Sequence, residues 1–308
     1  MVETMNVLSL FDGISCGQLA LIRAGFKDFV YYASEIDKNS INVTQYNFPN
    51  TIQLGDVRNV NSSLLPKIEL LIGGSPCQGF SFSGKQLNFD DERSKLFFEF
   101  ERILKETKPK YFLLENVMMK KEYEEVITKC LGVEPIMINS SLVSAQNRVR
   151  LYWTNIPNIE QPEDKGIKLS DIIEFDNEKN PAAIRGRKLF KATIVGRKIN
   201  SEGKREDYNS NIPTIQCLEV RNSNMDKSNC LTTVDKDNVL TSLEPGRYPD
   251  AFKNKLPFRY YTLKECCRLQ TVPDNYFGDI VSESKGKKML GNGWTVDVIS
   301  HILKNIKK

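Results

Sequence analysis

The sequence predicts an α/β protein with a doubly wound, mostly parallel sheet, and with a smaller, irregular and β-rich second unit. Short apolar runs, typical of strands buried on both faces, alternate with amphipathic segments over the first 156 residues. From about residue 161 to 257 the chain becomes polar, loop-rich and weakly periodic. Helical patterning then resumes. We therefore predict a first domain of residues 1–160 plus 259–308 and a second of residues 161–258.

Composition restricts the possible classes of protein. A chain of 308 residues with 40% hydrophobic content can bury a sizeable core. It has no run of 18 apolar residues and no basic, apolar leader, so we expect a cytoplasmic protein without a membrane partner. Seven scattered cysteines without a CxxC pair predict reduced thiols and no metal site. A net charge of +4 suits an anionic partner without requiring one.

The first strand is predicted over Asn6–Leu10, and a turn containing Gly13 and Gly17 leads from it into a helix over Gln18–Ala24. The two glycines allow the backbone to approach a ligand closely, and the helix N-terminus attracts negative charge. Cys16, inside the turn, is expected to be a packing residue. The glycine spacing differs from the dehydrogenase GxGxxG pattern, which disfavours a nicotinamide-dependent oxidoreductase.

Acidic residues end the next two predicted strands. Glu35 follows the strand Phe29–Ser34, about 20 residues beyond the glycine turn, where doubly wound folds hold a ribose diol. The alternative is a helix cap or solvated acid before the helix Lys38–Asn47. Asp56 closes a third strand, Ile52–Val57, and could accept a hydrogen bond from an amine on a bound base. Together these strand ends predict a ligand site at the carboxyl edge of the sheet.

A cysteine stands at the exit of the fourth predicted strand. Leu70–Ile72 is a short apolar run that Gly73 and Gly74 end abruptly. Pro76 then stiffens the segment that presents Cys77, which is how a nucleophile would be mounted. The alternative is that Cys77 is a small buried hydrophobic residue. A helix predicted over Ser94–Glu106 would pack on the sheet.

A carboxylate and two arginines complete the candidate site. The strand Tyr111–Val117 carries Glu115, whose apolar setting should raise its pKa and allow it to donate a proton to a ring nitrogen. A helix over Lys120–Leu131 and a strand over Glu134–Asn139 follow. Arg148 and Arg150 then project to the same side of an extended segment and could grip a carbonyl and a phosphate. The single histidine, His301, is expected to be a surface or packing residue of the last helix, so acid–base chemistry is left to carboxylates or water.

The second unit carries basic clusters at residues 185–188, 197–198 and 204–205, which favour contact with nucleic acid. A solvated basic face is the alternative. Strands are predicted there over Thr214–Leu218 and Cys230–Val234. A capped helix is predicted to start at Thr262, and the final helix is predicted to open from a glycine turn at Gly291.

These motifs, in this order, resemble those of the cytosine-C5 DNA methyltransferases. The resemblance covers about residues 5–156 and 259–300, and its length and inserted segment look most similar to a stand-alone bacterial or phage enzyme. The Leu96-Phe-Phe-Glu-Phe and Trp294-Thr-Val segments are similar to the de novo branch. The motifs are Phe11-Asp-Gly, Gly-Gly-Ser-Pro-Cys77-Gln, Glu115-Asn-Val, Gln146-x-Arg-x-Arg, the segment from Arg259 to Gln270, and Gly291-Asn-Gly.

The resemblance implies a Rossmann-like fold, S-adenosylmethionine as cofactor, double-stranded DNA as partner and a monomer without metal. Phe11 would lie against the adenine, Gly13 and Gly17 would form the methionine-side turn, Glu35 would hold the ribose, and Asp56 would face the adenine amine. The remaining cofactor residues would be Asp12, Ile36, Val57, Pro76, Leu96, Asn292 and Trp294. Trp294 departs from the usual small or aliphatic residue, and Cys16 interrupts the glycine turn.

The resemblance also implies the chemistry. The Cys77 thiolate would add to cytosine C6 while Glu115 donates to N3, after which C5 takes the methyl group and loses its proton to water. Arg150 would hold the cytosine O2, and Arg148 would orient the thiolate or a phosphate. The target nucleotide must be rotated out of the helix, with residues 79–93 closing over it. The expected DNA contacts are Gln78, Ser81, Lys85, Gln86, Arg93, Arg185, Arg187, Arg197 and Arg221.

Other readings remain open. One branch of the family methylates transfer RNA, but its Cys-Phe-Thr segment is missing here and a variable unit of about 100 residues favours DNA. A catalytically silent nucleic-acid-binding module is disfavoured by the intact Cys77, Glu115 and two arginines. The recognition sequence does not follow from one sequence, nor does the choice between restriction–modification, phage and orphan methylation.

Overall fold

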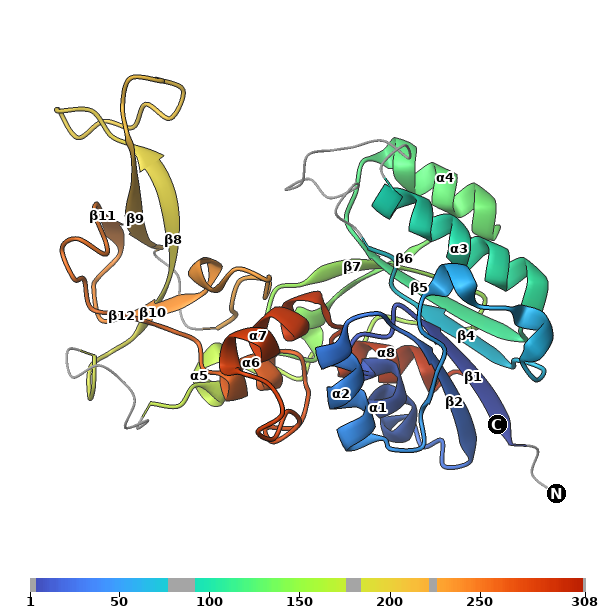
Figure 1. Cartoon of the computed structure of the whole chain (residues 1–308). Coiled ribbons are helices and arrows are strands. Elements are labelled where there is room, and N and C mark those ends of the chain that lie inside the picture. Colours follow the sequence, from blue (N-terminus) through green and yellow to red (C-terminus); the bar gives the residue numbers. More distant parts are fainter. Residues whose placement is uncertain (1–3, 77–91, 176–183, 222–225, 307–308) are drawn as a thin grey trace.

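The computed structural model describes residues 4–76, 92–175, 184–221 and 226–306 (Figure 1). Its larger sheet has seven strands in the order β3-β2-β1-β4-β5-β7-β6. The first five in this order run parallel, and β7 is antiparallel to both β5 and β6. The strands are β1 (Met5–Leu10), β2 (Phe29–Ser34), β3 (Ile52–Gln53), β4 (Leu70–Gly73), β5 (Tyr111–Val117), β6 (Ile136–Asn139) and β7 (Val149–Thr154).

Helices cover both faces of this sheet (Figure 1). On one side lie α1 (Cys16–Arg23), α2 (Lys38–Asn47) and α8 (Val296–Leu303); on the other lie α3 (Glu92–Thr107) and α4 (Lys121–Leu131). Successive strand residues alternate between the two cores, because strand side chains point to opposite faces. Leu70 and Ile72 pack in the core with α1 and α8, whereas Leu71 packs with α3 and α4. The predicted doubly wound class is confirmed.

The second sheet is entirely antiparallel, in the order β11-β9-β8-β10-β12. It encloses a small core of its own. Since β12 reaches Tyr260, the chain leaves this sheet slightly later than the predicted boundary at residue 258, and the domain limits stay a prediction. The strands are β8 (Phe190–Lys198), β9 (Thr214–Val220), β10 (Val239–Thr241), β11 (Gly246–Tyr248) and β12 (Phe258–Tyr260).

Three helices lie between the two sheets (Figure 1): α5 (Leu169–Ile172), α6 (Leu263–Leu269) and α7 (Glu283–Asn292). The predicted cap of α6 is confirmed, because the Thr262 hydroxyl accepts from the Glu265 backbone N–H while the Glu265 carboxylate accepts from the Thr262 N–H. Lys227 also joins the units, since its ammonium group donates to the carbonyls of Ser141, Ser144 and Ile167.

Three predicted elements are wrong. The third strand ends at Gln53, because Gly55 takes φ +73° and the Asp56 side chain caps a turn by accepting from the Arg58 N–H. Residues 230–234 form no strand, since side chains from the first unit bind the backbone of Leu231. Gly291 lies inside α7 rather than in a turn.

Helix α7 was not predicted, because glycines interrupt its helical pattern. Close packing explains one of these glycines. A Cβ on Gly291 would lie 2.3 Å from the carbonyl oxygen of Thr232. Backbone therefore packs directly on backbone at this point.

Candidate active site

A cavity of about 580 Å³ opens at the carboxyl ends of β1, β4 and β5 and continues beneath α7. Its size is typical of small-molecule sites, and its place is where doubly wound sheets bind ligands. Phe11, Gly13 and Glu35 line the end beside β1 and β2, whereas Glu115 and Arg150 line the end beside β5 and β7, since β4 separates these strand pairs in the sheet. The structure thus brings the predicted ligand-binding strand ends and the predicted catalytic side chains into one space.

The Asp12 carboxyl group holds the glycine turn together. Asp12 accepts hydrogen bonds from the Tyr31 hydroxyl at 2.8 Å and from the Ser15 hydroxyl at 2.6 Å. Burial raises the pKa of Asp12 to about 6, against the lowering effect of these two donors. The turn needs this support because Phe11, Gly13 and Ser15 all take φ near +60°, which is costly for side chains other than glycine.

Glu35 ties the end of β2 to the glycine turn. One carboxylate oxygen accepts the Gly13 N–H at 2.7 Å, and the other accepts the N–H groups of Ile36 and Asp37, both at 2.8 Å. Three backbone donors therefore fix the orientation of this carboxylate within the cavity wall.

The other predicted cofactor residues fall into two groups. Pro76, Asn292 and Trp294 line the cavity together with Asp12. The remaining five do not line it: Gly17, Ile36, Asp56, Val57 and Leu96.

The structure explains why four of these five residues do not line the cavity. Gly17 is a packing residue, because a Cβ there would lie 2.5 Å from Ile72 Cδ1. The Ile36 side chain is 69% exposed, and Val57 is buried in the core beneath α3. Asp56 pairs with Arg58 at 2.5 Å, and hydrogen bonds from Arg58 lower the pKa of Asp56.

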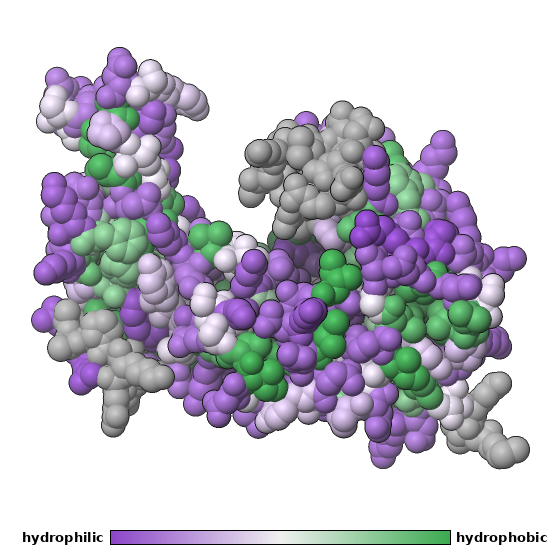
Figure 2. All heavy atoms as spheres, in the orientation of Figure 1, coloured by the Kyte–Doolittle hydropathy of each residue, from purple (hydrophilic) through white to green (hydrophobic). Residues whose placement is uncertain are grey.

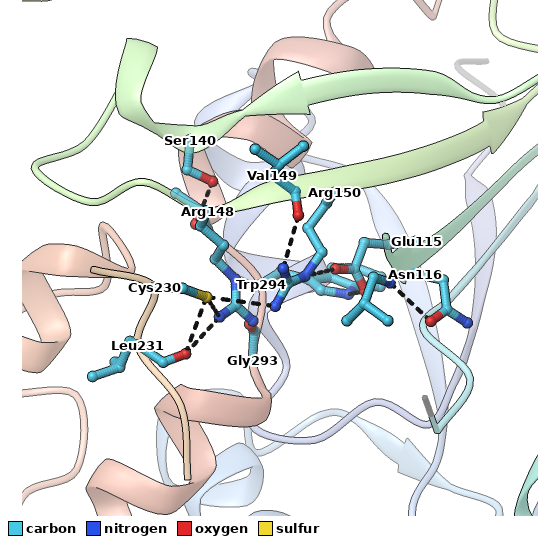
Figure 3. A network of polar contacts seen from close by, with 12 residues as sticks. Glu115, Asn116, Ser140, Arg148, Val149, Arg150, Cys230, Leu231, Gly293 and Trp294 are labelled. Atoms are coloured by element: carbon cyan, nitrogen blue, oxygen red, sulfur yellow. Dashed lines mark hydrogen bonds and ion pairs between the residues drawn. The ribbon is translucent and has the colours of Figure 1, made fainter. Parts of the chain in front are cut away.

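At the catalytic end, the Glu115 carboxylate contacts two side chains, one through an ion pair and one through a hydrogen bond (Figure 3). Arg150 Nε lies 3.0 Å from Glu115 Oε1, and the Trp294 indole N–H donates to Oε2 at 3.1 Å. The expected apolar setting of Glu115 is therefore wrong: a guanidinium and an indole N–H face its carboxylate. The contact from Trp294 was missed, since the two residues are far apart in sequence and no local pattern links them.

Arg148 is buried and satisfied by backbone carbonyls. It donates to Leu231 O at 2.8 Å, to Gly291 O at 3.2 Å and to Gly293 O at 2.8 Å (Figure 3). Burial lowers the pKa of this guanidinium. Arg148 thus joins β7 to the end of α7 and to the second unit.

Cys230 was also missed by sequence reasoning. Its Sγ lies 3.3 Å from Arg148 Nη1 and 3.8 Å from Arg150 Nη2. No motif singled it out, since it comes from a loop of the second unit.

Several predicted residues lie outside the described part of the chain: Cys77, Gln78, Ser81, Lys85 and Gln86. Arg93 belongs to α3, but its side chain is also outside the description. The described chain stops at Pro76, which lines the cavity.

A broad cleft lies between the second sheet and the larger unit, and its wall on the side of the second sheet is mainly hydrophilic (Figure 2). Arg185, Arg187 and Arg221 are exposed on the second unit. Arg197 forms an ion pair with Glu219 at 2.8 Å. Its predicted contact with DNA remains a prediction.

The described residues contain no helix long and apolar enough to cross a membrane. Across the same ranges, no group of three or more histidine, cysteine, aspartate or glutamate side chains is placed to hold a metal ion.

Comparison with known proteins decides the family. The family described as C-5 cytosine-specific DNA methylase matches residues 5–308. The chain belongs to this family. It is a DNA (cytosine-5-)-methyltransferase, and its relatives agree. The methylase is 29% identical to the type II methyltransferase M.FnuDI of Fusobacterium nucleatum, over 99% of this chain and 94% of that protein. It is 30% identical to the type II methyltransferase M1.ScrFI of Lactococcus lactis subsp. cremoris, over 96% and 76%.

Solved structures support the fold of the methylase. The methyltransferase EhMeth of Entamoeba histolytica matches with a TM-score of 0.70 at 18% identity, over 99% of this chain and 100% of that one. At such low identity the likeness concerns the fold alone.

Proposed function

We propose that the methylase transfers the methyl group of S-adenosylmethionine to C5 of a cytosine rotated out of a specific site in duplex DNA. The observation that carries this proposal is the continuous cavity, with Glu35 and the glycine turn at one end and the Glu115–Arg150 pair at the other. A methyl donor and a base bound at these two ends would meet inside one space.

The cavity fits the cofactor. Gly13 takes φ +60° with nothing within 4 Å of the position of a Cβ, so a ligand can approach its backbone. Glu35 would hold the ribose hydroxyls, Phe11 would lie against the adenine, and Pro76, Asn292 and Trp294 would complete the wall. When bound, S-adenosylmethionine supplies an electrophilic methyl group. The roles of Asp56, Ile36, Val57 and Leu96 stay predictions.

The chain's own groups would perform the rest of the reaction. The Cys77 thiolate forms a bond to C6 while Glu115 donates a proton to N3, so electron density moves to C5. After C5 has taken the methyl group, it loses its proton to water, the sulfur–C6 bond breaks and N3 returns its proton. Arg150, beside Glu115, would bind the cytosine O2. Arg148 would support this arrangement through the carbonyls it holds.

The test combines activity with trapping. The purified protein is incubated with S-adenosylmethionine labelled in the methyl group and with either duplex DNA or bulk transfer RNA. We expect label at cytosine C5 of DNA and none above background in RNA. Duplexes carrying 5-fluorocytosine at the site should become covalently joined to Cys77, because fluorine cannot leave as the proton does.

Two variants make this test specific. Cys77→Ala should abolish both transfer and trapping, whereas Cys130→Ala, which changes a cysteine on the remote helix α4, should retain both. Full transfer by Cys77→Ala would exclude the covalent route, and label found only in RNA would exclude the DNA substrate.

The biological setting follows the same proposal. The type II relatives and an orphan methyltransferase of Bacillus phage SPR, 35% identical over 49% of this chain, support sequence-specific modification by a restriction–modification, phage or orphan enzyme. Bisulfite sequencing of host DNA with and without the gene should show one modified sequence. Cytoplasmic location, a monomeric state and association with the nucleoid stay predictions.

A further inference from the structure

We propose that Trp294 is a positioning residue for Glu115: its indole N–H holds one oxygen of the catalytic carboxylate in the orientation from which that group meets the target base. This inference rests on the proposed function. It goes beyond the role of Trp294 in the wall of the cofactor site, because the indole contacts the catalytic side chain of Glu115.

The two side chains that contact the Glu115 carboxylate come from different parts of the fold. Arg150 reaches Oε1 from β7, and Trp294 reaches Oε2 from the loop between α7 and α8. A carboxylate oxygen can accept two hydrogen bonds, so Oε2 keeps one acceptor position besides that taken by the indole N–H. A carboxylate held at both oxygens cannot rotate freely about its terminal torsion, which is otherwise broad.

Two glycines form the slot in which the indole lies. A Cβ on Gly74 would be 2.9 Å from Trp294 Nε1 and 3.1 Å from Glu115 Oε2, so a side chain there would intrude on both partners of the contact. A Cβ on Gly17 would be 3.3 Å from Trp294 Cζ3. The hydrogen bond therefore depends on the end of β4 and the start of α1 as well as on its own two residues.

The contact lies in the wall of the cavity. Trp294 and Glu115 both line the cavity, and Gly293 precedes Trp294 with its carbonyl held by Arg148. Trp294→Phe keeps an aromatic ring in the wall but removes the N–H donor. Hydrogen bonds to charged groups are worth enough to change a rate by about tenfold to a hundredfold.

The first arm of the test observes the contact without any reaction. The chain has two tryptophans, so the ¹⁵N-labelled protein should show two indole N–H resonances, and Trp294→Phe assigns one of them by its absence. Glu115→Gln should move the Trp294 resonance. It should leave that of Trp153, whose indole donates to Thr128 Oγ1 in the core with α3 and α4, in place. If the position of the Trp294 resonance is the same in Glu115→Gln as in the wild type, the proposal is overturned.

The second arm measures methyl transfer. Trp294→Phe should lower kcat at least about tenfold while the dissociation constant for S-adenosylmethionine stays within about threefold. Trp153→Phe is the matched control, because it also removes an indole N–H, and it should keep the wild-type kcat. An unchanged kcat for Trp294→Phe overturns the proposal. If the wild type transfers no methyl group to duplex cytosine, the proposed function fails, and the resonance experiment still decides the contact.

Discussion

Arg150 Nε lies 3.0 Å from Glu115 Oε1 because β7 runs antiparallel to β5. Arg150 pairs with Val117, two residues beyond Glu115, so both side chains lie on the same face of the sheet. A parallel strand at this place would bring its last residues, not its first, to the carboxyl edge of the sheet. The reversed strand is thus what places an arginine from near its start beside a carboxylate near the end of its neighbour.

Arg150→Lys should lower kcat by about tenfold to a hundredfold. A lysine keeps the positive charge but cannot reproduce the planar contact of Nε with Glu115 and of Nη2 with Cys230. Steady-state kinetics on duplex DNA would check this. Arg102→Lys, in the ion pair with Glu99 on α3, serves as a control for the same chemical change and should keep the wild-type kcat. A kcat within twofold of wild type would contradict the assigned role of Arg150.

Arg148→Met should reduce the free energy of unfolding by about 3–5 kcal/mol, since it leaves three carbonyls without their donor. Arg58→Met is the comparison, because that arginine is 65% exposed and its pair with Asp56 is at the surface. Its loss should cost under about 1 kcal/mol. Urea denaturation of both variants measures the difference, and equal losses would show that Arg148 does not hold the structure together.

Asp12 should make stability depend on pH. Its folded-state pKa of about 6 lies above the ordinary value of 3.8, so between these values the folded protein keeps a proton that the unfolded chain releases. Wild-type stability should therefore fall relative to Asp12→Asn as pH rises from about 4 to 7, by on the order of 3 kcal/mol. Urea denaturation of both proteins across this range tests it. A constant difference between them would show that Asp12 does not titrate in this window.

Gly17→Ala should destabilise the protein by about 1–3 kcal/mol through overpacking. The new methyl group would lie 2.5 Å from Ile72 Cδ1 and 2.7 Å from the Tyr31 hydroxyl, both in the core. In Gly196→Ala the nearest atom is Cγ2 of Thr214, an exposed side chain at 2.9 Å, which can move away. Thermal denaturation should show a lower Tm for the first variant alone. Equal Tm values would mean that α1 can shift to accept the methyl group.

Local patterns were sufficient for much of the fold. Apolar runs such as Leu70–Ile72 lie in central strands, and the Thr262 and Glu265 pair caps α6 as predicted, because both features depend on neighbours in sequence. Cavity residues at strand ends, such as Glu35 and Glu115, were predictable for a related reason, since parallel strands bring their ends to one edge.

The rest depends on contacts between distant segments. Trp294 meets Glu115 across 179 positions of sequence, and Cys230 reaches Arg148 from the second unit. Asp56 and Arg197 carry the charges that a ligand or DNA contact needs, yet each is paired with another charged residue in the fold. Residue type alone does not reveal such pairing.

The packing of Gly291 on Thr232, where a Cβ would lie 2.3 Å from a carbonyl oxygen, limits how new sequence preferences can arise in this protein. A chimera that imports a foreign recognition segment must keep the loop around Thr232 in its present path, or replace it together with the end of α7. A chimera that keeps its activity should therefore be joined at positions inside the second unit that leave the contact between Gly291 and Thr232 intact, rather than at the ends of that unit.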